Sequence, residues 1–179
     1  MRPSSDTLVW VDLEMTGLDP ASCHIVQLAM VLTDTELNDI AAPLDLVVWQ
    51  PPAVLEEMSP FVRQMHEGSG LLEKIRTSTV GLEDAERQAL ELVSTHASYR
   101  KARLCGNSIG QDRRFLVRYM PVLEGYLHYR QIDVSTVKEL AGWWYGKRYE
   151  KSDEGKHTAL IDIRQSIAEL KHYRTQIFR

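Results

Sequence analysis

The first regular pattern of hydrophobic and polar residues runs from Leu8 to Glu14. Apolar side chains fill nearly every position as far as Leu13, and two carboxylates, Asp12 and Glu14, stand at the end of the run. Strand side chains alternate between two faces, so Asp12 and Glu14 point the same way and share their face with Leu8 and Trp10. Because both faces carry apolar residues, the pattern predicts a central strand that is covered on both sides.

Further apolar and β-branched runs predict four more strands, at residues 24–33, 44–49, 102–105 and 129–132. Apolar residues at helical spacing predict helices over 82–98, from Ser108 onward, over 135–145 and over 158–173. Ser108 with Gln111 three residues later is typical of a capping box at a helix start. Residues 55–72 should form short helical turns, and residues 146–156 should form a polar loop.

The order of these elements predicts the fold class. Short connections between the first three strands favour antiparallel pairing, and the helices between the later strands favour parallel pairing. We therefore expect an α/β fold with a mixed five-stranded sheet, three antiparallel strands and then two parallel ones, with helices on both faces. Nothing in the sequence divides the chain, so residues 1–179 should form a single domain.

Asp12 and Glu14 form the first candidate site. Two like charges at the end of a buried strand are costly unless something neutralises them, and a divalent metal ion can do so. The alternative is a strand that frays into solvent, where both carboxylates are simply hydrated.

Two further acids and a histidine pose the same question. Asp112 lies in the first turn of its helix on the face that also carries Phe115, where a carboxylate is out of place without a partner. A favourable interaction with the helix N-terminus would explain an acid in that turn, but not on that face. Asp162 lies in the last helix, and His157 precedes it on the polar loop. Taken singly, each is more often a surface residue.

Taken together, these residues suggest metal-dependent hydrolysis. Four carboxylates without cysteine ligands suit Mg²⁺ or Mn²⁺. Two such ions can clamp a phosphodiester and activate water for in-line attack. A nearby histidine is a natural general base for that water.

Composition limits the remaining possibilities. The formal net charge of −4 argues against binding to long duplex nucleic acid, but not against a short anionic substrate. Cys23 and Cys105 are the two cysteines and form no CxxC motif, which favours a reducing compartment such as the cytoplasm. The sequence shows neither a signal peptide nor an apolar run long enough to cross a membrane.

Four segments resemble the oligoribonuclease family, the dinucleotide-degrading branch of the DEDD exonuclease superfamily with a catalytic histidine. They read DLEMTGLD at 12–19, GNSIGQDRRFL at 106–116, DVST at 133–136 and HTALID at 157–162. The resemblance implies an RNase H-like fold and a homodimer. It also implies two-metal hydrolysis of very short single-stranded RNA from its 3′ end, with release of nucleoside 5′-monophosphates.

The resemblance also assigns roles by motif. The implied metal ligands are Asp12, Glu14, Asp112 and Asp162, with His157 as general base. Leu18 and Phe61 would wedge the bases. The implied residues around the 5′ phosphate are His66, Ser108, Arg130 and Ser135, and Tyr129 would reach across the dimer. A cap on a terminal phosphate would measure length, because a longer chain has no free terminus there.

The sequence departs from the family pattern at two positions, and it concentrates aromatic residues in one region. The family usually has Trp where this chain has Phe61, and Asp where it has Ile161. Neither change removes a ligand. Aromatic side chains gather at Tyr126, Tyr129, Trp143, Trp144 and Tyr145. We expect at least two of them in the core and the others at a dimer interface.

Two other interpretations stay open at this point. One is a proofreading-type DNA exonuclease of the same superfamily, which needs an open channel in place of a phosphate cap. The other is a non-catalytic nucleotide-binding module, which would normally have lost at least one of the carboxylates. The sequence gives neither the preferred base and metal nor the main cellular substrate, RNA-decay remnants or the products of cyclic-dinucleotide breakdown.

Overall fold

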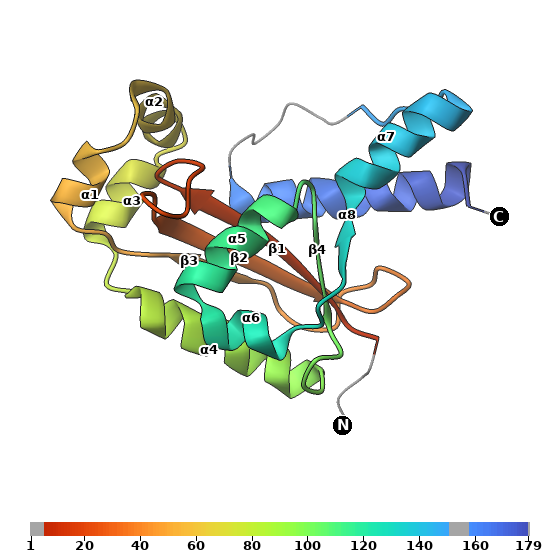
Figure 1. Ribbon diagram of the computed structural model, residues 1–179, viewed down its shortest axis with the longest axis horizontal. Coiled ribbons are helices and arrows are strands. Elements are labelled where there is room, and N and C mark those ends of the chain that lie inside the picture. The colour runs from red at the N-terminus through yellow and green to blue at the C-terminus, as the bar shows by residue number, and fades with distance from the viewer. Residues whose placement is uncertain (1–5, 151–157, 179) are drawn as a thin grey trace.

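Strand β1 (Leu8–Met15) lies at the centre of the molecule. The computed structural model describes residues 6–150 and 158–178. Within them, the five strands follow the order β3-β2-β1-β4-β5 (Figure 1). β1 pairs antiparallel with β2 (Ile25–Thr33), and β2 pairs antiparallel with β3 (Leu44–Val47). On its other side, β1 pairs parallel with β4 (Arg103–Gly106), which pairs parallel with β5 (Gln131–Asp133). The predicted mixed sheet is confirmed.

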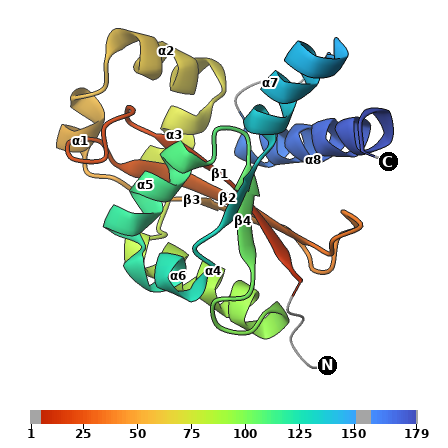
Figure 2. The ribbon, with the colours of Figure 1, turned by 45° about the vertical axis from the view of Figure 1, so that its right-hand side comes forward.

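Helices cover both faces of this sheet, as Figures 1 and 2 show. α4 (Leu82–His96), α5 (Gly110–Tyr119) and α6 (Pro121–Tyr126) pack on the face that carries Val9, Val11 and Leu13. α8 (Ala159–Gln176) packs on the opposite face, against Leu8 and Trp10. The alternation of β1 side chains therefore supplies two separate cores, and Asp12 and Glu14 belong to the α8 side.

Three short helices form a further layer. They are α1 (Pro52–Glu56), α2 (Pro60–Gly68) and α3 (Leu71–Thr77), and their apolar residues pack around Val26 of β2. Val26 lies near the start of β2, next to the end of β1, because the two strands run antiparallel. These helices agree with the short helical turns predicted for this region, and they flank the end of β1 that carries the carboxylates (Figure 1).

α7 (Val134–Tyr145) follows β5 directly and projects from the body of the molecule in both ribbon views (Figures 1 and 2). Trp143, Trp144 and Tyr145 in its last turn are 71%, 69% and 57% exposed, and Tyr129 before β5 is 74% exposed. Tyr126 alone is partly buried, and its hydroxyl donates to the Ala97 carbonyl. The expectation that at least two of these aromatics are core residues is therefore wrong, because α7 leaves the sheet before it reaches the tryptophans.

Two other predictions about helices need correction. α5 begins at Gly110 after Ile109, and no side chain caps its start, so the capping box at Ser108 is wrong. Ser108 instead has a φ of 50° and its side chain contacts Ser135. α6 was not expected, because a six-residue helix that begins at a proline shows little apolar periodicity. Within the described ranges, no helix is long and apolar enough to cross a membrane.

Candidate active site

The end of β1 brings three carboxylates together. Asp12 and Glu14 are one pleat apart on the face covered by α8, as the sequence predicted, and Asp162 lies in the first turn of that helix. One carboxylate oxygen from each of these three residues lies within 4.8 Å of the others. All three side chains are partly exposed, so ligands in solution can reach them.

Asp112 approaches the same strand from the other face of the sheet. It lies in the first turn of α5, is 7% exposed, and shares its buried face with Phe115 and Leu116. Its Oδ1 accepts a hydrogen bond of 2.9 Å from the backbone N–H of Leu13, the residue between Asp12 and Glu14. This bond fixes the fourth carboxylate to the same stretch of strand, so all four predicted acids meet at the end of β1.

The crowding of these acids shifts their protonation. Burial, followed by the charges of Asp162 and Asp112, raises the pKa of Glu14 to about 7. Burial also raises the pKa of Asp112 to about 7, despite the hydrogen bond from Leu13. Near neutral pH, Glu14 and Asp112 therefore hold protons more tightly than ordinary carboxyl groups do.

The donor set fits hard divalent cations. Every ligand atom that the cluster offers is a carboxylate oxygen, the type that Mg²⁺ and Mn²⁺ prefer. A bound divalent cation would favour the charged form of Glu14, against the burial and the neighbouring charges that raise its pKa. His157, the predicted general base, lies outside the described residues. Asp162 follows it by five positions in the sequence, and the Asp162 backbone N–H donates to the Thr158 carbonyl at 3.0 Å.

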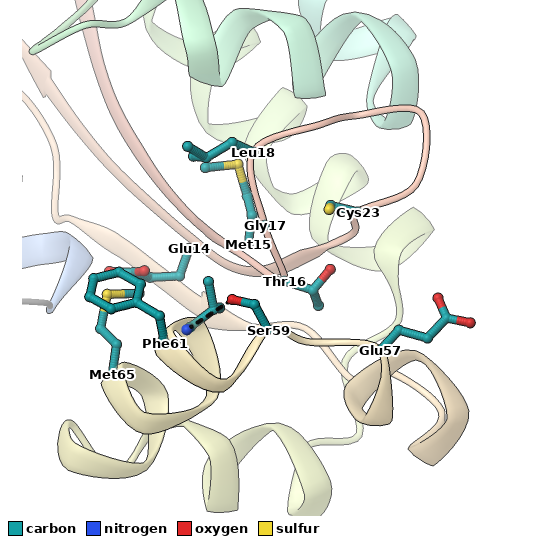
Figure 3. Close-up of a pocket in the computed structure, with 11 residues that line it drawn as sticks. Glu14, Met15, Thr16, Gly17, Leu18, Cys23, Glu57, Ser59, Phe61 and Met65 are labelled. Carbon is teal, nitrogen blue, oxygen red and sulfur yellow. Dashed lines mark hydrogen bonds between the residues drawn. The ribbon is translucent and has the colours of Figure 1, made fainter.

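A cavity of about 610 Å³ adjoins the carboxylates, and Glu14 lines it (Figure 3). Its other walls are mainly apolar and include Leu18 and Phe61, whose side chains reach into it from the loop after β1 and from α2. Leu18 is 71% exposed and Phe61 is 77% exposed. Two large apolar side chains held in solvent beside a carboxylate cluster suit contact with a flat, partly apolar ligand such as a nucleobase.

The loop that carries Leu18 is held in place by short contacts. A Cβ atom at Gly17 would lie 2.6 Å from Cys23 Sγ, so any larger residue there would require the Cys23 side chain to move. The Thr16 hydroxyl accepts the backbone N–H of His24 at 2.9 Å, which closes the loop at its base. From α5, the side chain of Gln111 donates to the Leu18 carbonyl. Leu18 therefore projects from a fixed loop and not from a free one.

Ser108 and Ser135 meet at the ends of the two parallel strands. Their hydroxyl oxygens are 3.1 Å apart, and the Ser108 backbone N–H donates to Ser135 Oγ at 2.9 Å. Asp133 ties the pair together, because its Oδ1 accepts both the Ser108 and the Ser135 backbone N–H at 2.9 Å. This assembles two of the four residues predicted to surround a 5′ phosphate.

The other two predicted phosphate residues make different contacts. His66 of α2 is buried, and its Nε2 donates to the Met15 carbonyl at 2.9 Å, so it supports the end of β1. Tyr129 and Arg130 precede β5, whereas Ser135 follows it, and the Arg130 guanidinium lies over the Tyr129 ring at 5.4 Å from its centroid. Among the hydrogen bonds of the described residues, none joins Arg130 to the serine pair.

Sequence analysis gave no role to Asp133 or to Asn107. Asp133 is the N-cap of α7, and the pattern of an acid two residues before a serine at a helix start could have identified it. Asn107 contacts Ser135, Ser166 and Glu169, the last of them 62 positions away. No local pattern signals such a set of partners.

Comparison with known proteins identifies relatives over the whole chain. A family model described as an exonuclease, RNase_T, matches residues 9–170. A protein of Marinobacter nauticus named oligoribonuclease is 48% identical over 177 residues, which cover 98% of each chain. Another protein of that name, from Aromatoleum aromaticum, is 47% identical over 180 residues, covering all of this chain and 98% of its own.

Solved structures show the same fold at lower identity. An exonuclease I from Methylocaldum szegediense superimposes with a TM-score of 0.74 at 20% identity, over 96% of this chain and 41% of its own. A zinc-bound exonuclease I from E. coli in complex with single-stranded DNA gives a TM-score of 0.72 at 17% identity. That match covers 98% of this chain and 42% of the other, so this chain spans about two fifths of these larger enzymes.

Proposed function

Because the chain belongs to the oligoribonuclease family of exonucleases, we propose that it hydrolyses very short RNA from the 3′ end and releases nucleoside 5′-monophosphates. The observation that carries this proposal is the position of Glu14, which belongs both to the carboxylate cluster and to the wall of the apolar cavity. A nucleobase in that cavity would bring its attached phosphodiester to the carboxylates.

Asp12, Glu14, Asp112 and Asp162 would hold two divalent ions, Mg²⁺ or Mn²⁺. When bound, such ions neutralise the acids, polarise the phosphodiester and activate water for attack. The protein contributes the fixed spacing of the four carboxylates: β1 holds two, and the hydrogen bond from Leu13 orients the third. Asp162 lies on α8, and the apolar face of this helix packs on β1.

His157 would act as the general base that takes a proton from the attacking water. Support comes from its place in the family motif, five residues before Asp162, and from the imidazole pKa near neutrality. Removal of this imidazole should slow the chemical step more than it weakens substrate binding.

Leu18 and Phe61 would hold the bases of the substrate. Both are exposed, both line the cavity, and both stand on rigid supports, since Gly17 and Gln111 fix one and the N-terminal turn of α2 carries the other. Phe61 stacks with less area than the tryptophan usual in the family. Stacking without hydrogen bonds to base edges also predicts weak discrimination between bases.

The 5′ phosphate of the substrate would bind at a separate site. Ser108, Ser135, His66 and Arg130 are the proposed residues around it, with Tyr129 reaching in from a partner. Arg130 supplies a permanent positive charge, and α7 begins directly beside Ser135. A terminal phosphate dianion would gain more from this environment than an internal diester, which makes the site a length selector.

We also propose that the active form is a homodimer of single-domain chains, each formed by residues 1–179. Trp143, Trp144, Tyr145 and Tyr129 are all more than half exposed, and such aromatics are enriched at interfaces. A second copy would cover them and could bring Tyr129 and Arg130 close to the serine pair. The free thiols of Cys23 and Cys105 fit a reducing compartment, for which we propose the cytoplasm.

Turnover of a 5′-phosphorylated diribonucleotide, measured with and without Mg²⁺, tests the activity. We expect Mg²⁺-dependent release of two mononucleotides and much slower turnover of a long single strand of RNA or DNA. Faster turnover of the long DNA strand would favour the proofreading-type exonuclease instead. Binding of the dinucleotide without hydrolysis under any divalent ion would favour a nucleotide-binding module.

Light scattering at micromolar concentration tests the assembly. The wild-type protein should have the mass of a dimer, and Trp143→Ser with Trp144→Ser should shift it toward the monomer. Tyr99→Ser is a matched control, because Tyr99 is an exposed aromatic on another part of the surface. A fully active wild-type monomer would overturn this proposal.

A further inference from the structure

We propose that Glu169, acting through Asn107, is a positioning residue that holds Ser108 for the terminal phosphate of the substrate. This inference rests on the proposed function. It names the residues that decide which groups donate and which accept hydrogen bonds in the proposed phosphate site. Glu169 lies on α8 and is fully buried, and Asn107 follows the last residue of β4. Together they connect the helix that carries Asp162 to the serine pair.

The amide of Asn107 can adopt only one orientation. Its Nδ2 donates to Glu169 Oε2 at 3.2 Å and to Ser166 Oγ at 2.7 Å. A carboxylate can only accept, and the Ser166 hydroxyl gives its single proton to the Asp162 carbonyl at 2.9 Å. Both partners on the α8 side are therefore acceptors, so the amide nitrogen must face α8 and the amide oxygen must face α7.

This orientation determines what Ser135 can do. Ser135 Oγ donates to Asn107 Oδ1 at 3.1 Å, which uses the one proton that the hydroxyl has. Toward Ser108 it therefore presents lone pairs, which accept the Ser108 backbone N–H at 2.9 Å. Ser135 is thus an anchor for Ser108 and not itself a donor to the phosphate, unless the bond to Asn107 breaks.

Ser108 is the exposed end of this chain of hydrogen bonds. Its φ of 50° lies in the left-handed region, which is unfavourable for a serine and must be held by its surroundings. The bonds from its N–H to Ser135 and to Asp133 provide that restraint. Its hydroxyl proton can rotate from Ser135 Oγ, 3.1 Å away, to a phosphate oxygen, which gives up that one bond and leaves both bonds of the Ser108 N–H intact.

Glu169 also fixes the distance between the phosphate site and the carboxylate cluster. It lies seven residues after Asp162 on the same helix, which corresponds to about 10 Å along the axis. The Tyr173 hydroxyl also donates to Glu169, at 3.4 Å, and helps to hold the carboxylate in place. One helix therefore carries both a proposed metal ligand and the residue that orients the phosphate site, so the separation of the two ends does not depend on a flexible loop.

Two variants interrupt the network at different points. Asn107→Ala removes the link, and Glu169→Leu removes the acceptor that orients it. In both, kcat/KM for a 5′-phosphorylated diribonucleotide should fall about tenfold or more, mainly through KM. The same dinucleotide without its 5′ phosphate should be hydrolysed at close to the wild-type kcat/KM. Glu169→Gln, which keeps an acceptor oxygen, should recover part of the loss.

Gln50→Ala is the matched control. Gln50 is a buried amide that donates to the Ile25 carbonyl at 2.8 Å and lies outside the proposed site. It should lose thermal stability without a change in the ratio of the two substrates. If Glu169→Leu fails to fold, Asn107→Ala carries the test, because Asn107 is only partly buried.

A double-mutant cycle separates positioning from general destabilisation. Asn107→Ala should cause no further loss on the phosphorylated substrate when Ser108 is already alanine, because its effect passes through Ser108. Additive losses, or equal losses on both dinucleotides, would overturn the inference and leave the proposed activity intact. Wild-type protein that hydrolyses neither dinucleotide would refute the proposed function itself.

Discussion

The two ends of the proposed substrate site are built in opposite ways. At the end of β1, four acids crowd together, and burial with mutual repulsion raises the pKa of Glu14 to about 7. At the ends of β4 and β5, Ser108 and Ser135 belong to a chain of hydrogen bonds in which each donor has an acceptor. We therefore expect the acidic end to need bound cations for its function, whereas the serine pair of the phosphate end is already held by hydrogen bonds within the chain.

The largest effect is expected from a substitution in the carboxylate cluster. Glu14→Gln keeps the size of the side chain and removes its charge, so it should lower kcat by roughly two or more orders of magnitude in saturating Mg²⁺. The metal-free variant should unfold at a temperature equal to or above that of the wild type, since repulsion from Asp162 is gone. Near-normal turnover in saturating Mn²⁺ would remove Glu14 from the ligand set.

The next effect concerns the phosphate end. Arg130→Ala should cost on the order of 2–5 kcal/mol in kcat/KM for a 5′-phosphorylated dinucleotide, as for a desolvated charge pair. A dinucleotide without the phosphate should lose much less, and the preference over a pentanucleotide should shrink. Equal slowing of all three substrates would mean that Arg130 does not select length. The Leu18–Phe61 pair would then be the next candidate for length selection.

The pH dependence of thermal stability distinguishes the acidic end of the site from the phosphate end. The folded protein holds the Glu14 proton more tightly than the unfolded chain, because its pKa is raised from 4.5 to about 7. The stabilising contribution of this group is therefore complete below about pH 4.5 and disappears as the pH rises through 7. The metal-free protein should lose several degrees of Tm between about pH 5 and 8, and Mg²⁺ should restore them at the higher pH.

Glu14→Gln provides the control for this titration. Its Tm should fall less over the same pH range, because one of the two carboxyl groups with a raised pKa is absent while Asp112 remains. The substitutions at Asn107 that leave the acidic end untouched should keep the wild-type pH dependence. An unchanged fall in Glu14→Gln would assign the pH dependence to other groups.

Sequence analysis predicted the acidic end better than the phosphate end, and the reason is the range of the interactions. The alternation that puts Asp12 and Glu14 on one face is visible within a single strand, and the apolar spacing around Asp112 places it on the buried face of its helix. The orientation of Asn107 depends on partners in α7 and α8, far along the chain, and no period of the sequence encodes it.

The errors at Ser108 and at the aromatics have related causes. A serine followed by a glutamine three residues later fits a capping box, but the bonds to Asp133 and Ser135 draw Ser108 away from the helix start. Trp143 and Trp144 look like core residues by their size. They are exposed because α7 projects beyond the sheet, and the length of that projection follows from the packing of the whole fold.

The smallest effect is expected at the residues proposed to hold the bases, between the two ends of the site. Phe61→Trp should lower KM for dinucleotides by about twofold to fivefold, because the larger ring adds stacking area beside Leu18. kcat should stay within about twofold, since Phe61 belongs to the cavity wall and not to the carboxylate cluster. A change in kcat with constant KM would argue that Phe61 aligns the scissile bond and does not merely hold the base.

The most direct test of the central claim is the ratio of kcat/KM for a 5′-phosphorylated diribonucleotide to that for a pentaribonucleotide, measured on the wild-type protein in Mg²⁺. An acidic end that cuts and a phosphate end that recognises a terminus at a fixed distance together predict a strong preference for the dinucleotide. That preference should largely disappear when the dinucleotide lacks its 5′ phosphate. Equal kcat/KM for both lengths, or a faster pentanucleotide, would contradict the account.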